Sequence, residues 1–379
     1  MVKNLLLIAL MSALGCGRAG FDEGKEAADA APRPDADVGL AKLGDQVGCR
    51  LALEPSSDGA DALLSWIALP EDDDVGDVYF ARVNVDGQVV VGPNRVGGAQ
   101  LRVGNVAVHP TSYGYVVFFE SSDALWMNRL DESGETLEAI RLATSVDYAT
   151  AVPTALGFNV IWQETASGLD LISQPFDQNG NALAAAAELD TSGEDPVAVA
   201  TTQGTLVAFS NRAPESAASL LVDDMAQAID ARLEQGTTRV RQTKVAVDGT
   251  AAVIADSLAS NERQPALSFV TVGVPLAEAA PTVDLGPKNR LEWSRPAVAF
   301  WQGQLVAVRI EDSSDPVPRV GRYVGAYGAA LSGPTMLTDG SRRAVCLELV
   351  TLNDGVLMAW TEVDFELATR TLRVANVTP

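Results

Sequence analysis

The chain has 379 residues, of which 47% are hydrophobic and 20% are charged, a composition typical of a globular protein with a sizeable core. Acidic residues outnumber basic ones by 50 to 27, so the net charge at pH 7 is −23. Such a surface repels phosphate backbones and anionic lipid headgroups; this excludes nucleic acid as a partner and favours cationic partners.

The first residues, 1–15, predict a signal peptide. Lys3 supplies a positive start, a short apolar segment follows, and small residues stand directly before Cys16. The apolar segment is too short to cross a bilayer as a helix, which takes about 20 residues. The pattern resembles the lipobox of bacterial lipoproteins. That resemblance implies diacylglycerol on the Cys16 thiol, cleavage before Cys16 and membrane anchoring through acyl chains. An ordinary secretory leader with a chance cysteine is the alternative.

Residues 16–37 predict a disordered tether. Ala, Asp, Glu and Pro dominate this segment, and Phe21 is its only large apolar residue. A segment of this kind cannot bury enough apolar surface to offset the entropy lost on ordering. The composition is similar to the tethers of myxobacterial lipoproteins. Together with Gly17 after the lipidated cysteine, this likeness implies a lipid-anchored location in the cell envelope, with the outer membrane favoured.

One short phrase recurs seven times between residues 38 and 379. It begins with glycine or a polar turn, continues with four or five mostly apolar residues that end in a larger one, and closes with polar residues. The phrases end at Trp66, Phe119, Trp162, Phe209, Ile254, Val308 and Trp360. Their mean interval is about 49 residues, and a period near 50 built from short strands is typical of β-propeller blades.

The whole repeat predicts a four-stranded blade. A strand of small residues precedes each phrase, and a third strand, an Asp- and Gly-containing turn and a fourth strand follow it. We therefore predict an all-β fold, a seven-bladed β-propeller with four-stranded blades. Six or eight blades remain alternatives, because the strand boundaries in the fourth and fifth repeats are weakly marked. The strands with G-x-x-x-x-W and the turns with L-D-x-x-G are similar to degenerate propeller repeats of bacterial lipoproteins.

The two ends of the repeat region predict how the ring closes. After Trp360 the chain has one further strand before Pro379, so the last blade lacks a fourth strand. The segment around Leu40 precedes the first repeat and has no partner there. If this N-terminal segment completes the last blade, backbone hydrogen bonds close the ring and no strand edge is left open.

The cysteines predict a covalent link at the same seam. Of the three cysteines, Cys49 and Cys346 lie in the predicted innermost strands of the first and last blades, which are neighbours in a closed ring. The compartment outside the cytoplasm is oxidising. We predict a Cys49–Cys346 disulfide; two unpaired buried cysteines are the alternative.

The sequence offers little for catalysis or metal binding. It contains no nucleophile elbow, metalloprotease motif, phosphate-binding loop or dinucleotide fingerprint, so we assign no catalytic residue and no cofactor. His109 is the only histidine and is predicted to be structural. The acidic run is a weak Ca²⁺ candidate, although a solvated loop explains it better. Its residues are Asp72, Asp73, Asp74 and Asp77.

Acidic residues recur just after the apolar phrase, where the strands of a propeller reach one face. They are Glu120, Glu164, Asp256, Glu311 and Glu362. Such a rim would bind cations or a basic partner, or supply a carboxylate pair for glycoside cleavage; strands that simply end in water are the alternative. Trp126, Trp293 and Trp301 would stack on sugars or pack between blades.

Taken together, these patterns favour a monomeric, lipid-anchored envelope propeller that acts as a binding or protein-interaction module. Its partner would be a protein or a glycan held by loops on one face, and the membrane would be contacted through the lipid only. A carbohydrate-active enzyme of the glycoside hydrolase or lyase type, with carboxylates on the propeller face, is one alternative. A structural component of an envelope complex is the other.

Overall fold

A computed structural model describes residues 41–45, 47–68, 75–122, 124–165, 170–190, 193–212, 215–235, 244–248, 251–260, 262–273, 275–285, 296–311, 319–364 and 369–379. Every regular element in these ranges is a β-strand. No helix long and apolar enough to cross a bilayer occurs in these ranges. The predicted signal peptide and the whole of the predicted tether, Cys16 included, lie outside the described residues.

The strands of the described residues form six antiparallel sheets. The largest contains β2 (Val47–Pro55), β3 (Asp61–Ala68), β4 (Val75–Asn84), β5 (Val89–Thr111), β6 (Gly114–Ser121), β7 (Ala124–Leu130) and β8 (Thr136–Thr144). Two four-stranded sheets follow, one of β9 (Val146–Pro153), β10 (Gly157–Glu164), β11 (Asp170–Asp177) and β12 (Ala187–Asp190), and one of β13 (Gly193–Thr201), β14 (Gly204–Arg212), β15 (Glu215–Val222) and β16 (Ala228–Gln235).

The remaining three sheets also have four strands each. One contains β17 (Lys244–Asp248), β18 (Ala251–Ser260), β19 (Glu262–Thr271) and β20 (Ala277–Asp284). The next contains β21 (Ala297–Trp301), β22 (Gln304–Glu311), β23 (Arg319–Ala326) and β24 (Ser332–Met336). The last contains β25 (Arg343–Leu352), β26 (Gly355–Asp364), β27 (Thr369–Asn376) and β1 (Ala41–Asp45).

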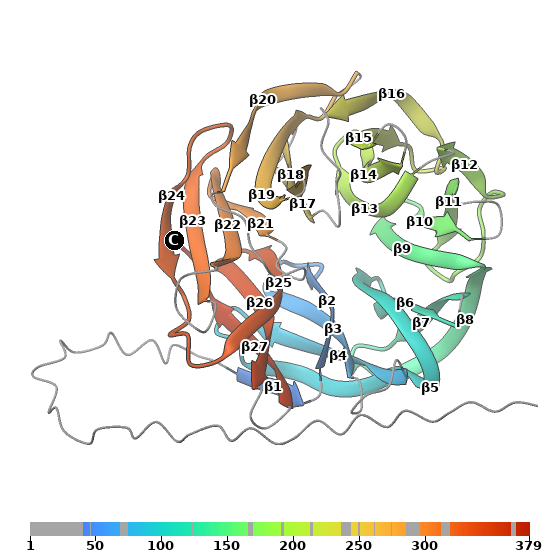
Figure 1. Ribbon diagram of the computed structural model, residues 1–379. Coiled ribbons are helices and arrows are strands. Elements are labelled where there is room, and N and C mark those ends of the chain that lie inside the picture. Colours follow the sequence, from blue (N-terminus) through green and yellow to red (C-terminus); the bar gives the residue numbers. More distant parts are fainter. Residues whose placement is uncertain are drawn as a thin grey trace, which may run out of the picture. The chain divides into compact units, whose positions relative to one another are not determined.

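The sheets of the unit formed by residues 36–379 stand around a common centre (Figure 1). The inner strands β2, β5, β9, β13, β17, β21 and β25 contact one another in this order, and β25 contacts β2 again. An all-β ring of radial sheets is a β-propeller, so the predicted propeller with four-stranded blades is confirmed.

The number of separate blades differs from the prediction. Seven were expected and the described residues form six sheets, a number that the sequence had left open. The reason is β5, a single continuous strand that is the outermost strand of the first predicted blade and the innermost strand of the second. Its first part pairs with β4 and its last part pairs with β6, so the first two predicted blades share this strand and form one seven-stranded sheet.

The predicted closure of the ring is confirmed. β1 pairs antiparallel with β27, with Ala41 opposite Val374, and completes the last sheet. A second link joins the first and last sheets, between the β2–β3 turn and the β25–β26 turn. The backbone N–H of Asn353 donates to the Gly59 carbonyl at 2.9 Å, and its side-chain Nδ2 donates to the Asp58 carbonyl at 2.8 Å.

The seven apolar phrases form the second strand of each repeat, and these strands carry the core. They are β3, β6, β10, β14, β18, β22 and β26. All eight residues of β6 are buried, as are the first seven of β10 and of β26. Because each sheet is covered on both faces by its neighbours, its central strands are apolar on both sides. Trp66, Phe209 and Trp360 are among the largest fully buried side chains.

Four of the described outer hairpins have the same type of turn, which is capped by an Asn or Asp side chain. The side-chain Oδ1 of the first turn residue accepts hydrogen bonds from the backbone N–H groups two and four residues later. This pattern occurs at Asn84, Asp131, Asp177 and Asp223. The fourth turn residue has a positive φ, which glycine adopts without strain; it is Gly180 in the third repeat, with φ +82°.

The inner strands β5, β9, β13 and β25 each contain a bulge, in which two residues face one residue of the second strand. In three of them the first bulged residue has a positive φ although it is not glycine: Tyr148, Asp195 and Cys346. The pairing of β2 is irregular in the corresponding segment, between Val47 and Leu51. The bulges therefore lie near one end of the central channel, at the start of each inner strand.

Candidate functional site

Several predicted site residues cannot be located. Asp72, Asp73, Asp74 and Trp293 lie outside the described residues, and so do the side chains of Cys49 in β2 and Asp256 in β18. Asp77 is described and pairs with Arg95 at 2.9 Å. Within the described ranges, no group of three or more His, Cys, Asp or Glu residues is placed to hold a metal ion. Trp126 and Trp301 pack against buried core clusters.

The predicted rim residues all lie at or near the ends of second strands, which reach the same face of the ring. Two of them are held by arginines of their own sheet. Glu311 accepts from Arg309 at 2.6 Å and from the Tyr323 hydroxyl. Glu362 accepts from Arg373 Nε at 3.0 Å and lies 3.7 Å from Arg342. Glu164 also has a partner. These carboxylates therefore use acceptor capacity inside the fold.

Glu120 differs from Glu164, Glu311 and Glu362 because it is buried, with 7% of its surface exposed. Its oxygens accept from the backbone N–H of Asn105 at 3.3 Å, from Asn105 Nδ2 at 3.1 Å and from the backbone N–H of Ala149. Asn105 in turn accepts from Arg50. Burial raises the pKa of Glu120, although these hydrogen bonds and Arg50 oppose the shift. The network links β2, β5, β6 and β9.

A polar residue follows the end of the apolar phrase in five repeats and is buried in each. These residues are Glu120, Gln163, Ser210, Arg309 and Thr361. All of them except Arg309 lie beside an inner-strand bulge, where the regular ladder of backbone hydrogen bonds is interrupted. Glu120 and Arg309 are held by hydrogen bonds inside the propeller, whereas Ser210 Oγ and Gln163 Oε1 are buried without a hydrogen-bond partner among the described residues.

His109 lies in the core beside the central channel. Its Nε2 is 2.6 Å from the Ala151 carbonyl, to which the neutral ring donates, and its ring lies against Phe118 and Phe158. Burial lowers the pKa of His109 to about 4, so the ring is neutral at physiological pH. The channel itself has a volume of about 150 Å³ and is lined mainly by small and aliphatic side chains of the inner strands.

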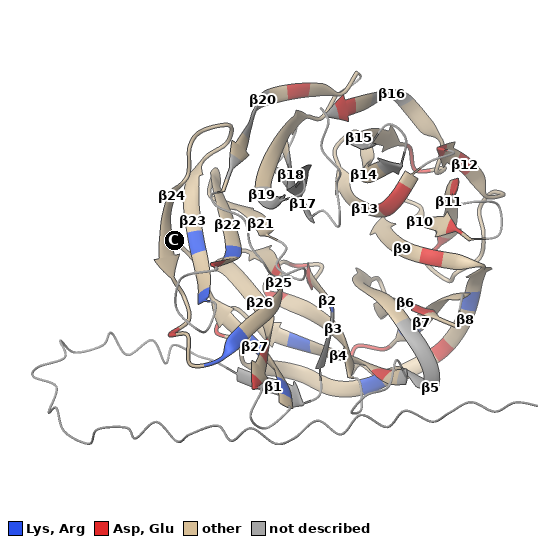
Figure 2. Ribbon diagram, viewed as in Figure 1, with Lys and Arg blue, Asp and Glu red and all other residues tan. Residues whose placement is uncertain are grey.

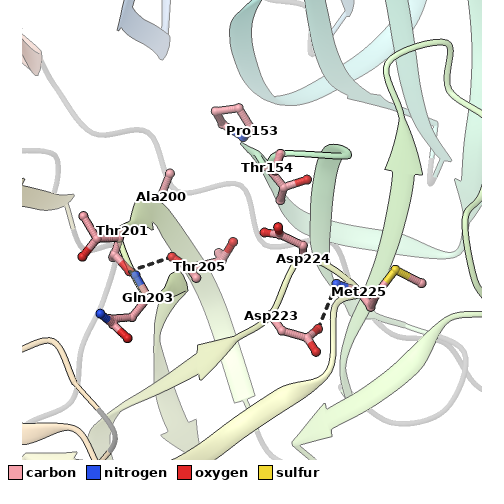
Figure 3. Close-up of a pocket in the computed structure, with 12 residues that line it drawn as sticks. Pro153, Thr154, Ala200, Thr201, Gln203, Thr205, Asp223, Asp224 and Met225 are labelled. Carbon is pink, nitrogen blue, oxygen red and sulfur yellow. Dashed lines mark hydrogen bonds between the residues drawn. The ribbon is translucent and has the colours of Figure 1, made fainter.

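A larger cavity lies on the face of the ring opposite the inner-strand bulges, between the third and fourth repeats. It has a volume of about 610 Å³ and is formed by the β9–β10 turn, the β13–β14 turn and the β15–β16 turn. Figure 3 shows Thr201, Gln203 and Thr205 on one side and Asp223, Asp224 and Met225 on the other. We refer to this cavity, lined by residues 153–155, 200–205 and 223–225, as the turn groove.

The polar groups of the turn groove fall into two classes. Those of Thr201 and Asp223 stabilise their own turns: the Thr201 hydroxyl donates to the Gly204 carbonyl at 2.7 Å, and Asp223 accepts from Met225 N–H at 2.8 Å. The Asp224 carboxylate and the Gln203 amide accept or donate no hydrogen bond to other described residues. The groove therefore presents unused hydrogen-bonding groups to solvent.

The floor of the turn groove is buried. Thr205 is only 2% exposed, and its hydroxyl accepts one long hydrogen bond of 3.4 Å, from Asn159 Nδ2. Asn159 Nδ2 also donates to the Asp223 carbonyl at 2.6 Å, whereas Asn159 Oδ1 has no partner. Two fully enclosed side chains with spare hydrogen-bonding capacity thus lie beneath the groove.

The sequence did not predict the turn groove. Its third wall is a turn equivalent to those at Asp131–Gly134 and Asp177–Gly180, but Ala226 takes the positive-φ position with φ +59°. A search for glycine therefore passes over it. A Thr-x-x-Gly pattern before the phrase, at Thr111, Thr154 and Thr201, is the signal that could have identified the other two walls.

No protein-family model and no curated protein matches the chain. Among solved structures it is similar to the WD40 domain of Toxoplasma gondii coronin, with 12% identity, a TM-score of 0.53, and coverage of 90% of this chain and 84% of the other. The WD40 domain of SCAP from fission yeast matches with 10% identity, a TM-score of 0.47, and 88% of each chain covered. Trypanosoma rangeli sialidase in complex with the inhibitor DANA matches with 8% identity, a TM-score of 0.47, and coverage of 89% of this chain and 56% of the other. At these identities the likeness shows the propeller fold alone.

Proposed function

We propose that this chain is a lipid-anchored β-propeller of the cell envelope that works as a protein-binding module. The observation that carries the proposal is the turn groove, an open cavity of about 610 Å³ with hydrogen-bonding groups that no described residue uses. Concave sites with a few unused polar groups beside apolar ones are the usual form of binding sites.

Binding is favoured over hydrolysis because of how the carboxylates are held. Glycoside cleavage requires two carboxyl groups that face each other across a cleft, about 5 to 10 Å apart. Glu311 and Glu362 are instead paired with arginines, and Glu120 is enclosed by hydrogen bonds from Asn105 and Ala149. The turn groove contains Asp223, whose Oδ1 caps its own turn, and leaves Asp224 as the carboxylate available to a ligand.

The anchor is part of the proposal. Acylated Cys16 followed by a polar tether would hold the propeller at the membrane surface while its turns stay accessible, with the outer membrane as the favoured location. We also propose a disulfide between Cys49 and Cys346. β2 and β25 contact each other, each cysteine lies in an irregular segment of its strand, and the Cys346 sulfur is not a free thiol.

The test is affinity capture of the full-length protein from its own membrane after mild cross-linking, with identification of the captured proteins. We expect one envelope protein to be recovered with the wild type and to be reduced with Cys16→Ser, which should also fail to incorporate labelled palmitate. Recovery of no specific protein, together with release of reducing sugar from envelope glycans by the purified chain, would replace the binding proposal with the enzymatic one.

A further inference from the structure

We propose that the turn groove receives a lysine or arginine side chain from an extended segment of the partner protein. This inference rests on the proposed binding function and names the chemistry of its ligand. The first support is the composition of the groove, whose lining contains Asp223 and Asp224 and no Lys or Arg. Its available groups, Asp224 and Gln203, include an anionic acceptor suited to a cationic donor.

The surroundings of the groove carry the same sign of charge. Between Arg141 and Arg212 the sequence has no Lys or Arg and has eight Asp and Glu residues. This stretch forms β9 to β14, and Figure 2 shows acidic but no basic colouring on the described parts of β9–β13. The groove therefore lies within an acidic sector of the ring, which attracts a cationic segment and steers it toward the cavity.

The side chains that close the corresponding gap in the second repeat are replaced in the third repeat. In the second repeat the corresponding gap is closed by Tyr113, whose hydroxyl donates to the Gln178 carbonyl, while Ser112 donates to the Gln178 side chain at 2.9 Å. The residue equivalent to Tyr113 in the third repeat is Leu156, which stands before Gly157 as Tyr113 stands before Gly114. Leu156 is 49% exposed and does not line the cavity.

The apolar groups at the groove favour a peptide over a sugar. Met225 lines the cavity and is 37% exposed, and Leu156 belongs to the adjoining turn. Such groups suit the aliphatic stem of a lysine or arginine, and methionine adapts to varied peptide partners. No aromatic residue lines the cavity, so a sugar ring would find no flat surface on which to stack.

The test uses the full-length protein and three probes: fluorescein-labelled hexalysine, labelled hexaserine and chitotetraose. Binding is measured by fluorescence anisotropy at physiological ionic strength, with chitotetraose as competitor. Asp224→Asn removes the free carboxylate, and Glu132→Gln removes one charge from an exposed turn of the second repeat as the matched control. Leu156→Tyr fills the gap without a change in charge, by analogy with Tyr113.

We expect hexalysine to bind the wild type and hexaserine not to bind. Asp224→Asn and Leu156→Tyr should each weaken hexalysine binding by about fivefold or more, and Glu132→Gln by less than about twofold. Equal losses for Asp224→Asn and Glu132→Gln would reduce the effect to diffuse charge and overturn the inference. Displacement of hexalysine by chitotetraose would overturn it in favour of a glycan. Thermal melting of each variant checks the fold; if Leu156→Tyr is unfolded, the pair Asp224→Asn and Glu132→Gln decides.

The two proposals can fail separately. If the wild type and Leu156→Tyr capture the same envelope protein equally well, the groove inference fails while the binding function stands. If neither captures a protein but hexalysine still distinguishes Asp224→Asn from Glu132→Gln, the groove chemistry stands and the envelope-binding function fails.

Discussion

Buried titratable side chains set the pH response of this protein at the scale of single residues. His109 and Glu120 are both enclosed, and burial shifts their pKa values in opposite directions because it disfavours the charged form of each. The protein should therefore lose stability through His109 when the pH falls and through Glu120 when the pH rises.

His109 provides the first prediction. Its pKa is about 4 in the folded protein against an ordinary value of 6.5, so the unfolded chain takes up a proton first as the pH falls. Stability should decline between these two values by an amount on the order of 3 kcal/mol. His109→Gln keeps a donor for the Ala151 carbonyl and removes the titration. Urea unfolding at pH 7 and pH 4.5 should show a larger decline for the wild type; equal declines would contradict the buried neutral histidine.

Glu120 provides the second prediction. Its raised pKa means that the folded protein accepts the protonated form more easily than the carboxylate, so its contribution to stability is fully present below the ordinary value of 4.5 and is lost as the pH rises. The unfolding free energy of the wild type, measured relative to that of Glu120→Gln, should therefore fall as the pH rises from 4 toward 8. The exposed Glu132→Gln serves as control and should show no such trend.

At the scale of elements, the outer turns hold neighbouring repeats together. The Asx-capped turns at Asp131, Asp177 and Asp223 present their positive-φ residues to the preceding repeat. A Cβ added to Gly180 would lie 2.4 Å from Met127 Cε and 3.0 Å from Ile140 Cδ1. In the next repeat, the buried Ala226 carbonyl accepts from the Ser173 hydroxyl at 2.7 Å. The turns thus fix the distance between adjacent repeats as well as the hairpins that contain them.

Glycine substitutions test this role. Gly180→Ala combines a strained backbone, φ +82°, with overlap at Met127, and should lower the unfolding free energy by about 3 kcal/mol. Gly303→Ala has a similar φ of +73° and open space around the new methyl group, so its cost should be about 1 to 2 kcal/mol. Denaturant unfolding of both variants gives the comparison, and equal costs would show that contact with Met127 is unimportant.

At the scale of the whole molecule, the ring depends on its seam. The chain ends meet there because β1 pairs with β27 and the inner strands β2 and β25 contact each other. On the other side of the last sheet, Arg322 of β23 holds the C-terminal segment, since its Nη1 donates to the carbonyls of Val377 and Thr378 at 2.9 and 2.7 Å. Opening the seam would expose apolar surface of both flanking sheets and the unpaired edge of β27.

Removal of the closing strand is therefore expected to destabilise the protein. A variant without residues 38–46 should melt several degrees below the wild type, because β27 loses its partner strand and the last sheet loses its outer cover. A variant without residues 19–35, taken from the predicted tether, should melt with the wild type. Equal melting temperatures for the wild type and the 38–46 deletion would show that the ring does not need this strand.

The proposed disulfide acts on the same seam. Peptide mass spectrometry without reduction should recover residues 49 and 346 in one cross-linked pair, and reduction should lower the melting temperature. In the chain-entropy model, closing so long a loop contributes about 5 kcal/mol. The variant Cys346→Ser should match the reduced wild type. Recovery of both cysteines in alkylated form from the unreduced protein would contradict the link.

Several features could be predicted from the sequence because they arise within one repeat or from counting strands. The apolar phrases predicted the buried second strands, and the predicted Asp- and Gly-containing turns after the third strand include those at Asp131–Gly134 and Asp177–Gly180. The closing strand followed from the one missing in the last repeat. Seven separate blades were favoured, with six left open, because nothing in residues 89–111 shows that one strand pairs with both β4 and β6.

The candidate site was the part that the sequence could not supply. Local alternation of apolar and polar residues fixes strands and their buried faces, since side-chain direction follows from the backbone period. The turn groove depends instead on the fit between turns of different repeats, where Tyr113 reaches Gln178 in one place and Leu156 leaves a cavity beside Asp224 in the next. Only tertiary packing brings residues so distant in the chain together. The sequence alone therefore determined the repeat and the ring, and the packed structure decided which gap in that ring is open.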